Sequence, residues 1–292
     1  MLLTQLVNKE KVLRNAEVEW TMYPKSSTPK SICYILNEEF IDLINDNLNI
    51  SAVITPEQFI PLFTKEKGIF LSDSPQKDYY NLHNQLARMG KMKLISDGKI
   101  SPHAQIHPTA IIEDRVIIED GVEISAYTII RKNTVICKGT SIGSFCEIGA
   151  RGMQNIYVDG DIFNLEFMGG VEIGENCEIL SHAIIQKPYH AYNTKIGRQN
   201  RISVKTSIGH GSIIGNYNRI AGNGTLSGNV QIGNYVKMGP SVTISDAIKI
   251  GNFTRIRLGS VVSNNISENS DVSGNFALDH KKNLKNYARI RK

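Results

Sequence analysis

The strongest constraint on this chain is an aliphatic side chain that recurs at every sixth position. A period of six matches neither the 3.6 residues of an α-helix nor the two-residue alternation of a simple strand. It is typical of a parallel coil of short flat strands, in which each aliphatic side chain points into a triangular prism. The recurring residues are Ile100, Ile106, Ile112, Ile118, Ile124, Ile130, Ile136, Ile142 and Ile148, then Ile173, Ile179 and Ile185, then Ile196, Ile202, Ile208, Ile214, Ile220, Leu226, Ile232, Met238, Ile244, Ile250, Ile256 and Val262. We therefore expect a mainly β protein, with a parallel β-helix over residues 99–270. An ordinary β-sandwich would require this spacing to arise by accident at every one of these positions.

Two stretches interrupt the repeat. Residues 150–170 contain three large aromatic side chains and cannot keep the six-residue phase, and residues 186–195 lengthen one step, because Ile185 and Ile196 are separated by eleven positions. Loops that leave a rigid scaffold often carry binding residues.

The remaining parts of the chain lack the repeat. Residues 1–98 combine apolar runs at 32–36 and 50–54, which read as strands, with helical patterns at 38–48 and 76–90. We expect a small α/β domain there. Residues 271–292 form a short basic tail in which we expect a short helix, and its basic residues are His280, Lys281, Lys282, Lys285, Arg289, Arg291 and Lys292.

Charge is distributed unevenly, although the net charge is only +5. No Asp or Glu occurs between Ile179 and Ser245. The basic residues in this stretch are Lys187, Lys195, Arg198, Arg201, Lys205, Arg219 and Lys237. A surface with a positive electrostatic field favours anionic ligands such as diphosphates. The alternative is a basic face that is solvated and binds no ligand. Nucleic acid is disfavoured because no stacking aromatics are interleaved with these bases.

Several classes of protein are disfavoured by what the sequence lacks. The N-terminus has no apolar core of the kind found in signal peptides, and no run of about 18 apolar residues could span a membrane. Cys33, Cys137, Cys146 and Cys177 lie far apart, which favours reduced thiols in a cytoplasmic protein. No set of side chains has metal-ligand spacing, so we expect no metal.

The order of parts resembles a known family. An α/β domain, the opening Ile100-Ser101-Pro102 and a loop after Ile148 together resemble UDP-3-O-acylglucosamine N-acyltransferase. That enzyme belongs to the hexapeptide-repeat acyltransferases, which have a left-handed parallel β-helix. The resemblance implies a nucleotide-binding role for residues 1–98 and a homotrimer with active sites between prisms. It also implies a thioester co-substrate, an acyl-CoA or an acyl carrier protein, with no resident cofactor.

The same resemblance assigns a nucleotide site near the N-terminus. The family grips the uracil ring with two aromatic residues and an asparagine between them, and Tyr34, Asn37 and Phe40 fall at these places. Aromatic faces suit a planar base. The residues alone favour a different interpretation, in which Tyr34 and Phe40 are core residues of a strand and a helix start.

Catalytic roles fall on two residues of the basic stretch. By the resemblance, His210 is the catalytic base and the Gly228 N–H binds the oxyanion. Their separation of eighteen residues is one full coil, so they stack at the inter-strand spacing of about 5 Å. A neutral imidazole is a suitable base for an amine nucleophile at pH 7. The alternative for His210 is an ordinary exposed histidine. His182 and His190 are expected in loops or on the surface.

The chain also departs from the family pattern. No acidic residue lies near His210 in the sequence, so a group that orients the imidazole must come from elsewhere, such as a neighbouring subunit. The family's second histidine is replaced around Ser245-Asp246-Ala247. We therefore expect an N-acyltransferase for a UDP- or dTDP-linked amino sugar of surface glycans such as lipopolysaccharide or O-antigen. The lipid A enzyme itself, a non-catalytic scaffold and a β-helix carbonic anhydrase are the alternatives.

Overall fold

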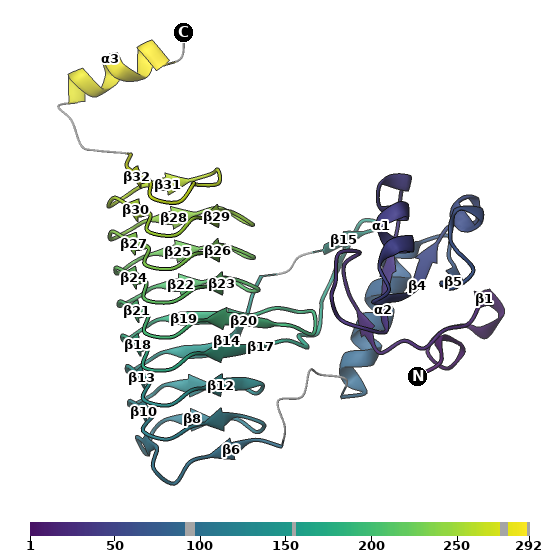
Figure 1. Cartoon of the computed structure of the whole chain (residues 1–292), viewed down its shortest axis with the longest axis horizontal. Coiled ribbons are helices and arrows are strands. Elements are labelled where there is room, and N and C mark those ends of the chain that lie inside the picture. The colour runs from purple at the N-terminus through teal and green to yellow at the C-terminus, as the bar shows by residue number, and fades with distance from the viewer. Residues whose placement is uncertain (91–96, 154–155, 275–279, 291–292) are drawn as a thin grey trace. The chain divides into compact units, whose positions relative to one another are not determined.

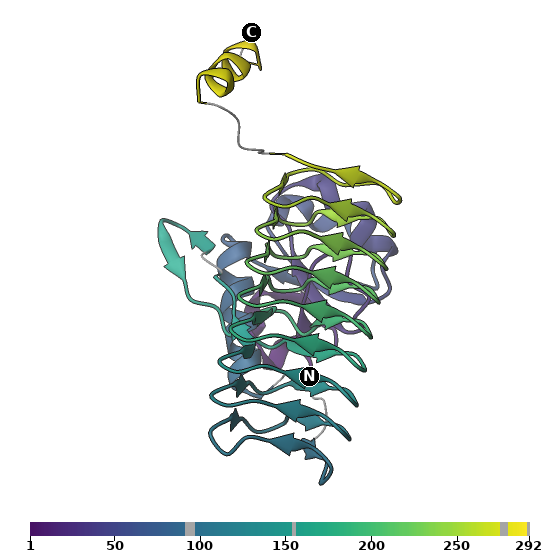
Figure 2. The same ribbon diagram turned by 90° about the vertical axis from the view of Figure 1, so that its left-hand side faces the viewer.

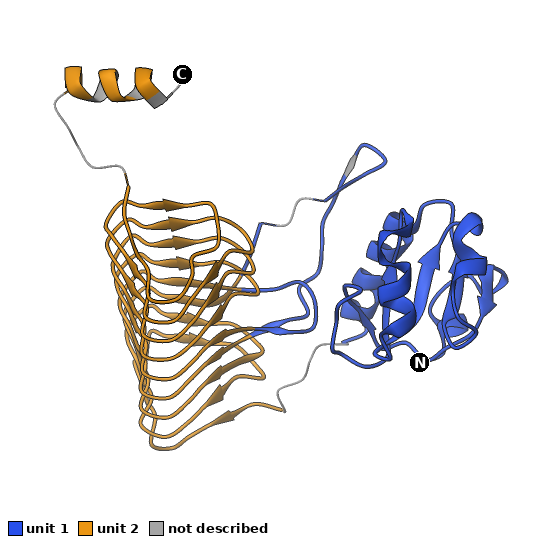
Figure 3. Ribbon diagram, turned by 45° about the horizontal axis from the view of Figure 1, so that its top comes forward, with its two compact units in different colours: residues 1–96, 151–170, 187–193 blue, residues 97–150, 171–186, 194–292 orange. Residues whose placement is uncertain are grey.

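The computed structural model describes residues 1–90, 97–153, 156–274 and 280–290. The chain divides into two compact units, shown in blue and orange in Figure 3. The α/β unit consists of residues 1–96, 151–170 and 187–193, and the β-helix unit consists of residues 97–150, 171–186 and 194–292.

The β-helix unit contains three parallel sheets, which form the faces of a prism (Figure 1). Face 1 consists of β6 (Lys99–Ile100), β9 (Ile117–Ile118), β12 (Thr134–Ile136), β17 (Gly170–Ile173), β20 (Asn193–Ile196), β23 (Ile213–Ile214), β26 (Gln231–Ile232) and β29 (Lys249–Ile250). Face 2 consists of β7 (Gln105–Ile106), β10 (Glu123–Ile124), β13 (Ser141–Ile142), β18 (Glu178–Ile179), β21 (Arg201–Ile202), β24 (Arg219–Ile220), β27 (Lys237–Met238), β30 (Arg255–Ile256) and β32 (Asp271–Val272). Face 3 consists of β8 (Ile111–Ile112), β11 (Ile129–Ile130), β14 (Glu147–Arg151), β19 (Ile184–Lys187), β22 (Ser207–Ile208), β25 (Thr225–Leu226), β28 (Thr243–Ile244) and β31 (Val261–Val262). The expected left-handed parallel β-helix is confirmed.

Away from the two interruptions, each coil repeats the one before it with a shift of eighteen residues. Ile208 pairs with Leu226, and Leu226 pairs with Ile244, in a parallel register that Figure 2 shows as strands stacked coil on coil. These side chains are almost completely buried and belong to one continuous aliphatic column along the prism. Burying an aliphatic side chain of this size contributes about 1.5–3 kcal/mol. A coil gains this stabilisation only when it stacks on its neighbours, so no single coil could be stable alone.

The corners between faces use left-handed backbone. Tyr217, Asn223, Asn229 and Tyr235 follow one another at six-residue steps, and each has φ between 56° and 61°. This conformation costs a non-glycine residue about 1–2 kcal/mol. Hydrogen bonds offset the cost, because the N–H of each such residue donates to a carbonyl of the preceding coil, as Asn229 does to His210 at 2.8 Å.

One corner is reinforced by an asparagine ladder. The Asn234 Oδ1 accepts from the Asn216 N–H at 2.7 Å and from the Asn216 Nδ2 at 3.0 Å, and Asn252 caps Asn234 in the same way. We expect Asn234→Ala to lower the free energy of unfolding by about 1–3 kcal/mol, because partly buried donors lose their acceptor. Urea unfolding measures the loss. Gln231→Ala, an exposed change on the same coil, should stay within about 0.5 kcal/mol, and equal losses in the two variants would refute the ladder's role.

The α/β unit is built on a mixed sheet of strand order β1-β5-β4-β3-β2, in which only β1 runs antiparallel to its neighbour. Its strands are β1 (Val12–Arg14), β2 (Trp20–Thr21), β3 (Ser31–Tyr34), β4 (Ile50–Thr55) and β5 (Gly68–Leu71). Its helices are α1 (Ile41–Asp46), α2 (Pro75–Arg88) and the 3-10 turns Leu3–Gln5, Lys9–Lys11, Glu38–Phe40 and Glu57–Leu62. The sequence indicated β3, β4, α1 and α2, and it missed β1, β2 and β5. Strands β1 and β2 are short and partly exposed, whereas β5 is as long and as buried as β3.

Both interruptions of the repeat belong to the α/β unit. The first forms a hairpin of β15 (Ile156–Val158) and β16 (Asp161–Phe163). The segment after this hairpin is anchored by His83, whose Nε2 lies 2.9 Å from the Glu166 carbonyl oxygen. The second places His190 in the core, where its Nε2 lies 2.9 Å from the Tyr79 hydroxyl. His190 lies in the loop between β19 and β20, as one of the two expectations had it, but it is fully buried and not at the surface.

The C-terminal segment begins with β32, which extends face 2, and includes α3 (His280–Ile290). The expected short helix is confirmed, while Arg291 and Lys292 lie outside the described residues. The four cysteines are free thiols, and burial raises the pKa of Cys33 to about 12. Among the helices of the described residues, none is long and apolar enough to cross a bilayer.

Candidate active site

A stack of three residues occupies the corner between face 3 and face 1. His210 follows β22, Gly228 follows β25 and Asp246 follows β28, so the three residues take the same position in successive coils. The backbone confirms the stacking, because the Asn229 N–H donates to the His210 carbonyl at 2.8 Å and the Ala247 N–H donates to the Gly228 carbonyl at 2.9 Å. Steps of eighteen residues therefore bring a histidine, a glycine and a carboxylate together on a rigid scaffold.

The side chains of this stack converge on the space above Gly228. A Cβ atom placed on Gly228 would lie 2.5 Å from the His210 Cε1, 2.6 Å from its Nε2 and 3.1 Å from the Asp246 Oδ1. The Gly228 N–H donates a hydrogen bond of 2.8 Å to the same Asp246 oxygen. Any Cβ at this position would force the imidazole to move, because the ring occupies the volume that the Cβ would need.

The electrostatics of the corner favour a neutral imidazole near pH 7. His210 is half-buried, and this desolvation lowers its pKa below the ordinary value of about 6.5. The negative charge of Asp246 acts in the opposite direction and raises the same pKa. A neutral imidazole can accept a proton, and the carboxylate can stabilise the imidazolium that forms.

Two expectations about this corner change in the structure. The space above Gly228 holds the His210 ring. Its N–H, the expected oxyanion donor, is already bonded to Asp246. The acidic partner of His210 comes from the same chain, thirty-six residues or two coils later. Asp246 is not adjacent to His210 in the sequence. The eighteen-residue step that joins His210 to Gly228 nevertheless reaches position 246 as well.

The residues expected to grip a nucleobase lie on the α/β unit. Tyr34 packs against a cluster that includes α2, with its ring centroid 4.9 Å from that of Tyr79. Phe40 packs against a different cluster, which includes Cys33 and Ile35. Asn37 is exposed, and its Oδ1 accepts from the Glu39 N–H at 3.1 Å to cap the 3-10 turn. The structure thus pairs Tyr34 with Tyr79 rather than with Phe40.

The basic residues between Ile179 and Ser245 are distributed over several surfaces. Arg201, Arg219 and Lys237 project from face 2, Lys195 projects from face 1, and Lys187 is buried. His182 lies at the corner between faces 2 and 3, where it stacks on Phe145 with ring centroids 5.1 Å apart. The acid-free stretch therefore does not form one cleft around His210 within a single β-helix.

Similarity to known proteins is confined to solved structures, since no family model and no curated protein matches the chain. LpxA from Acinetobacter baumannii is 26% identical with a TM-score of 0.48, over 67% of this chain and 76% of that chain. A UDP-N-acetylglucosamine acyltransferase from Campylobacter jejuni is 24% identical with a TM-score of 0.40, over 65% and 82%. A mutant perosamine N-acetyltransferase from Caulobacter crescentus, in complex with CoA and GDP-perosamine, is 14% identical with a TM-score of 0.19, over 79% and 70%. The last two of these three structures are named as acyltransferases. By its own repeat and its three parallel sheets, the chain is a hexapeptide-repeat protein with a left-handed parallel β-helix.

Proposed function

We propose that the protein transfers an acyl group from a thioester donor to the amino group of a nucleotide-linked amino sugar. The observation that carries the proposal is the stack of His210, Gly228 and Asp246, in which a half-buried imidazole lies beside a carboxylate and a backbone N–H. A base, a counter-charge for its protonated form and an N–H donor are the groups that aminolysis of a thioester requires.

In the proposed reaction, His210 Nε2 takes a proton from the attacking amine as the nitrogen bonds to the thioester carbon. The C–O π electrons move onto oxygen and form a tetrahedral oxyanion. When the oxyanion collapses, the C–S bond breaks, the imidazolium returns the proton to the departing sulfur, and the products are an amide and a free thiol. Every proton is accounted for without another reactant.

Asp246 has two successive roles in this scheme. In the resting site it holds the Gly228 N–H. When the thioester enters, its carbonyl oxygen takes over that N–H, and the carboxylate turns to the imidazolium. Asp246 is exposed, so its side chain has room for this rotation. A preorganised N–H donor of this kind contributes about 10²–10³ in kcat.

The charge of Asp246 gives the proposal a pH signature. Because His210 must be neutral to act as a base, kcat/KM should fall as the pH decreases through a pKa below 6.5. Asp246→Asn keeps an oxygen for the Gly228 N–H but removes the charge that raises the His210 pKa. We expect the acid limb to move to lower pH and kcat at pH 8 to fall about tenfold. An acid limb that stays in place would show that Asp246 does not act on His210.

The finer assignments remain predictions. They are a nucleotide site at Tyr34, Asn37 and Phe40, an acyl-CoA or acyl carrier protein donor, and a homotrimer. The proposed acceptor is a UDP- or dTDP-linked amino sugar of a surface glycan.

The test of the proposed function is thiol release from a panel of acyl-CoA donors mixed with UDP- and dTDP-amino sugars, followed by the same acceptors with acyl carrier protein donors. We expect turnover with one donor–acceptor pair that requires both substrates. No release from any pair, with either kind of donor, would favour the non-catalytic scaffold.

A further inference from the structure

A row of four cations crosses face 2 on successive coils. Arg201 pairs directly with Arg219, Arg219 with Lys237, and Lys237 with Arg255, and all four side chains are exposed. The side chains of directly paired residues in a parallel ladder are neighbours at the strand spacing of about 4.8 Å. We call Arg219 and Lys237 the middle pair.

Carboxylates lie at the ends of this row but not at its centre. At one end Glu178 forms an ion pair with Arg201 at 3.2 Å. At the other end Asp271 lies opposite Arg255 in the ladder, where its negative charge acts on Arg255, while its ion pair at 2.6 Å is with Arg257. Within the ranges that the structure describes, no carboxylate comes within ion-pair distance of the middle pair. The positive charge of the row is therefore concentrated at Arg219 and Lys237.

Such a row works against the stability of the unliganded protein. Like charges at directly paired positions repel one another. Face 1 avoids this arrangement, because Ile213 and Gln231 separate Lys195 from Lys249 in the equivalent ladder. A local arrangement that lowers stability without an evident structural gain is characteristic of a functional site.

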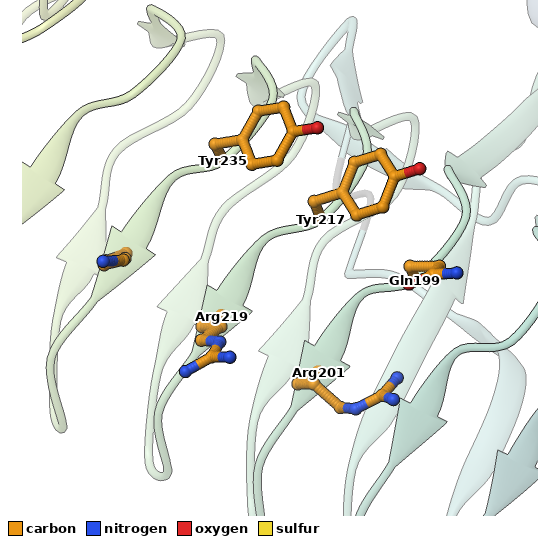
Figure 4. A pocket seen from close by; sticks show the side chains of 6 residues that line it. Gln199, Arg201, Tyr217, Arg219 and Tyr235 are labelled. Atoms are coloured by element: carbon orange, nitrogen blue, oxygen red, sulfur yellow. The ribbon is translucent and has the colours of Figure 1, made fainter.

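The middle pair also lines a hollow. A pocket of about 350 Å³ is bordered by Gln199, Arg201, Tyr217, Arg219, Tyr235 and Lys237, and Figure 4 shows the two tyrosines along one side and the arginines along the other. The tyrosine rings stack on each other with centroids 4.8 Å apart and planes at 4°, and Phe253 continues the stack at 5.2 Å. The stacked ring faces cover one another, so the tyrosines offer ring edges and hydroxyl groups instead of a surface for a nucleobase.

We propose that this pocket on face 2 binds a diphosphate group. Two adjacent cations suit two linked phosphates, and a guanidinium donates two parallel hydrogen bonds to phosphate oxygens. Edges of aromatic rings carry partial positive charge and hydroxyls can donate, so the second side of the pocket also favours an anion. A nucleotide-linked sugar and coenzyme A both carry this group, and naming them as sources rests on the proposed function.

The site is separate from the catalytic corner within one β-helix. His210 lies between face 3 and face 1, which is the corner opposite face 2. Replacing His210 should therefore leave diphosphate binding intact. Loss of diphosphate binding can then be distinguished from loss of acyl transfer.

The experiment measures binding and thermal stability together. Inorganic pyrophosphate, UDP and coenzyme A are titrated into the wild type, Arg219→Gln, Lys237→Gln, the control Lys249→Gln from face 1, and His210→Ala. We expect pyrophosphate to raise the Tm of the wild type, of Lys249→Gln and of His210→Ala. In the two middle-pair variants its dissociation constant should rise at least tenfold, which is about 1.4 kcal/mol. Comparing the dissociation constants of UDP and coenzyme A identifies which of the two ligands supplies the diphosphate.

Without ligand, Lys237→Gln should melt above the wild type, because it relieves the repulsion in the row, whereas Lys249→Gln should not. Unchanged pyrophosphate affinity in both middle-pair variants would overturn the proposal. So would a Tm increase equal to that produced by sodium chloride at the same ionic strength, since screening alone would then explain it. A decrease in the Tm of ligand-free Lys237→Gln would contradict the argument from repulsion.

Discussion

Replacing His210 with alanine is expected to lower kcat for acyl transfer by about 10²–10⁴-fold, the usual contribution of a positioned general base. The imidazole lies beside Gly228 and Asp246, and burial keeps its pKa below 6.5, so the ring is neutral and able to take a proton at pH 7. KM should change little, because the proton transfer occurs after binding. Initial rates of thiol release with saturating substrates provide the measurement.

A matched control tests whether the loss of activity is specific to His210 or follows the replacement of any histidine. His182→Ala removes a histidine from another corner, where the ring stacks on Phe145, and should leave kcat within about twofold of the wild type. A His210→Ala variant with full activity would exclude His210 as the base. If no activity is found in any variant, the scaffold interpretation gains support.

Gly228→Ala is expected to reduce kcat by about 10²-fold while the protein stays folded. The new methyl group would lie 2.5 Å from the His210 Cε1 and 2.6 Å from its Nε2, closer than carbon atoms approach. The ring can escape by rotating about its side-chain bonds, which preserves the coil but moves the base. Displacement of a catalytic group by about 1 Å can cost about 10²-fold in rate. Kinetics and circular dichroism together test this expectation.

The control for this substitution is Gly274→Ala, because an added Cβ there would have no neighbour within 4 Å. It should retain wild-type kinetics. Wild-type activity in Gly228→Ala would mean that the His210 ring does not act from the position seen in the structure. Unfolding of Gly228→Ala would point instead to a structural requirement for glycine at this corner.

The β-helix could be predicted because its signal is local and repeated. Ile208, Leu226 and Ile244 face the interior at the same place in three coils, so each coil independently reports the same period. Strands β1, β2 and β5 gave no comparable signal. Strands β1 and β2 have only three and two residues, and the pairing of all three strands in one sheet depends on residues distant in the sequence.

Half of the proposed catalytic corner was predictable in the same way. The eighteen-residue step joins His210 to Gly228, and one more step reaches Asp246. The sequence cannot show which side-chain conformations the residues adopt. The hydrogen bond from the Gly228 N–H to Asp246, and the imidazole in the space that a Cβ would fill, are properties of side chains packed across three coils.

The basic stretch shows what a count of charges leaves out. Seven basic residues without an acid suggested one anion-binding surface, but position within the eighteen-residue coil decides which face each one joins. Arg201, Arg219 and Lys237 share a phase and line up on face 2, whereas Lys195 lies on face 1. Tyr217 and Tyr235 share another phase, so aromatic rings that looked isolated in the sequence stack beside the basic row.

The most direct test of the proposed function is mass analysis of the sugar nucleotide after incubation with a donor that releases thiol. We predict that wild-type protein adds the mass of one acyl group to the sugar nucleotide, in a bond that resists hydroxylamine as an amide does, and that His210→Ala forms about 10²-fold less product. A product that hydroxylamine cleaves would be an ester and would contradict transfer to an amino group. Thiol release without an acylated sugar nucleotide would contradict acyl transfer altogether.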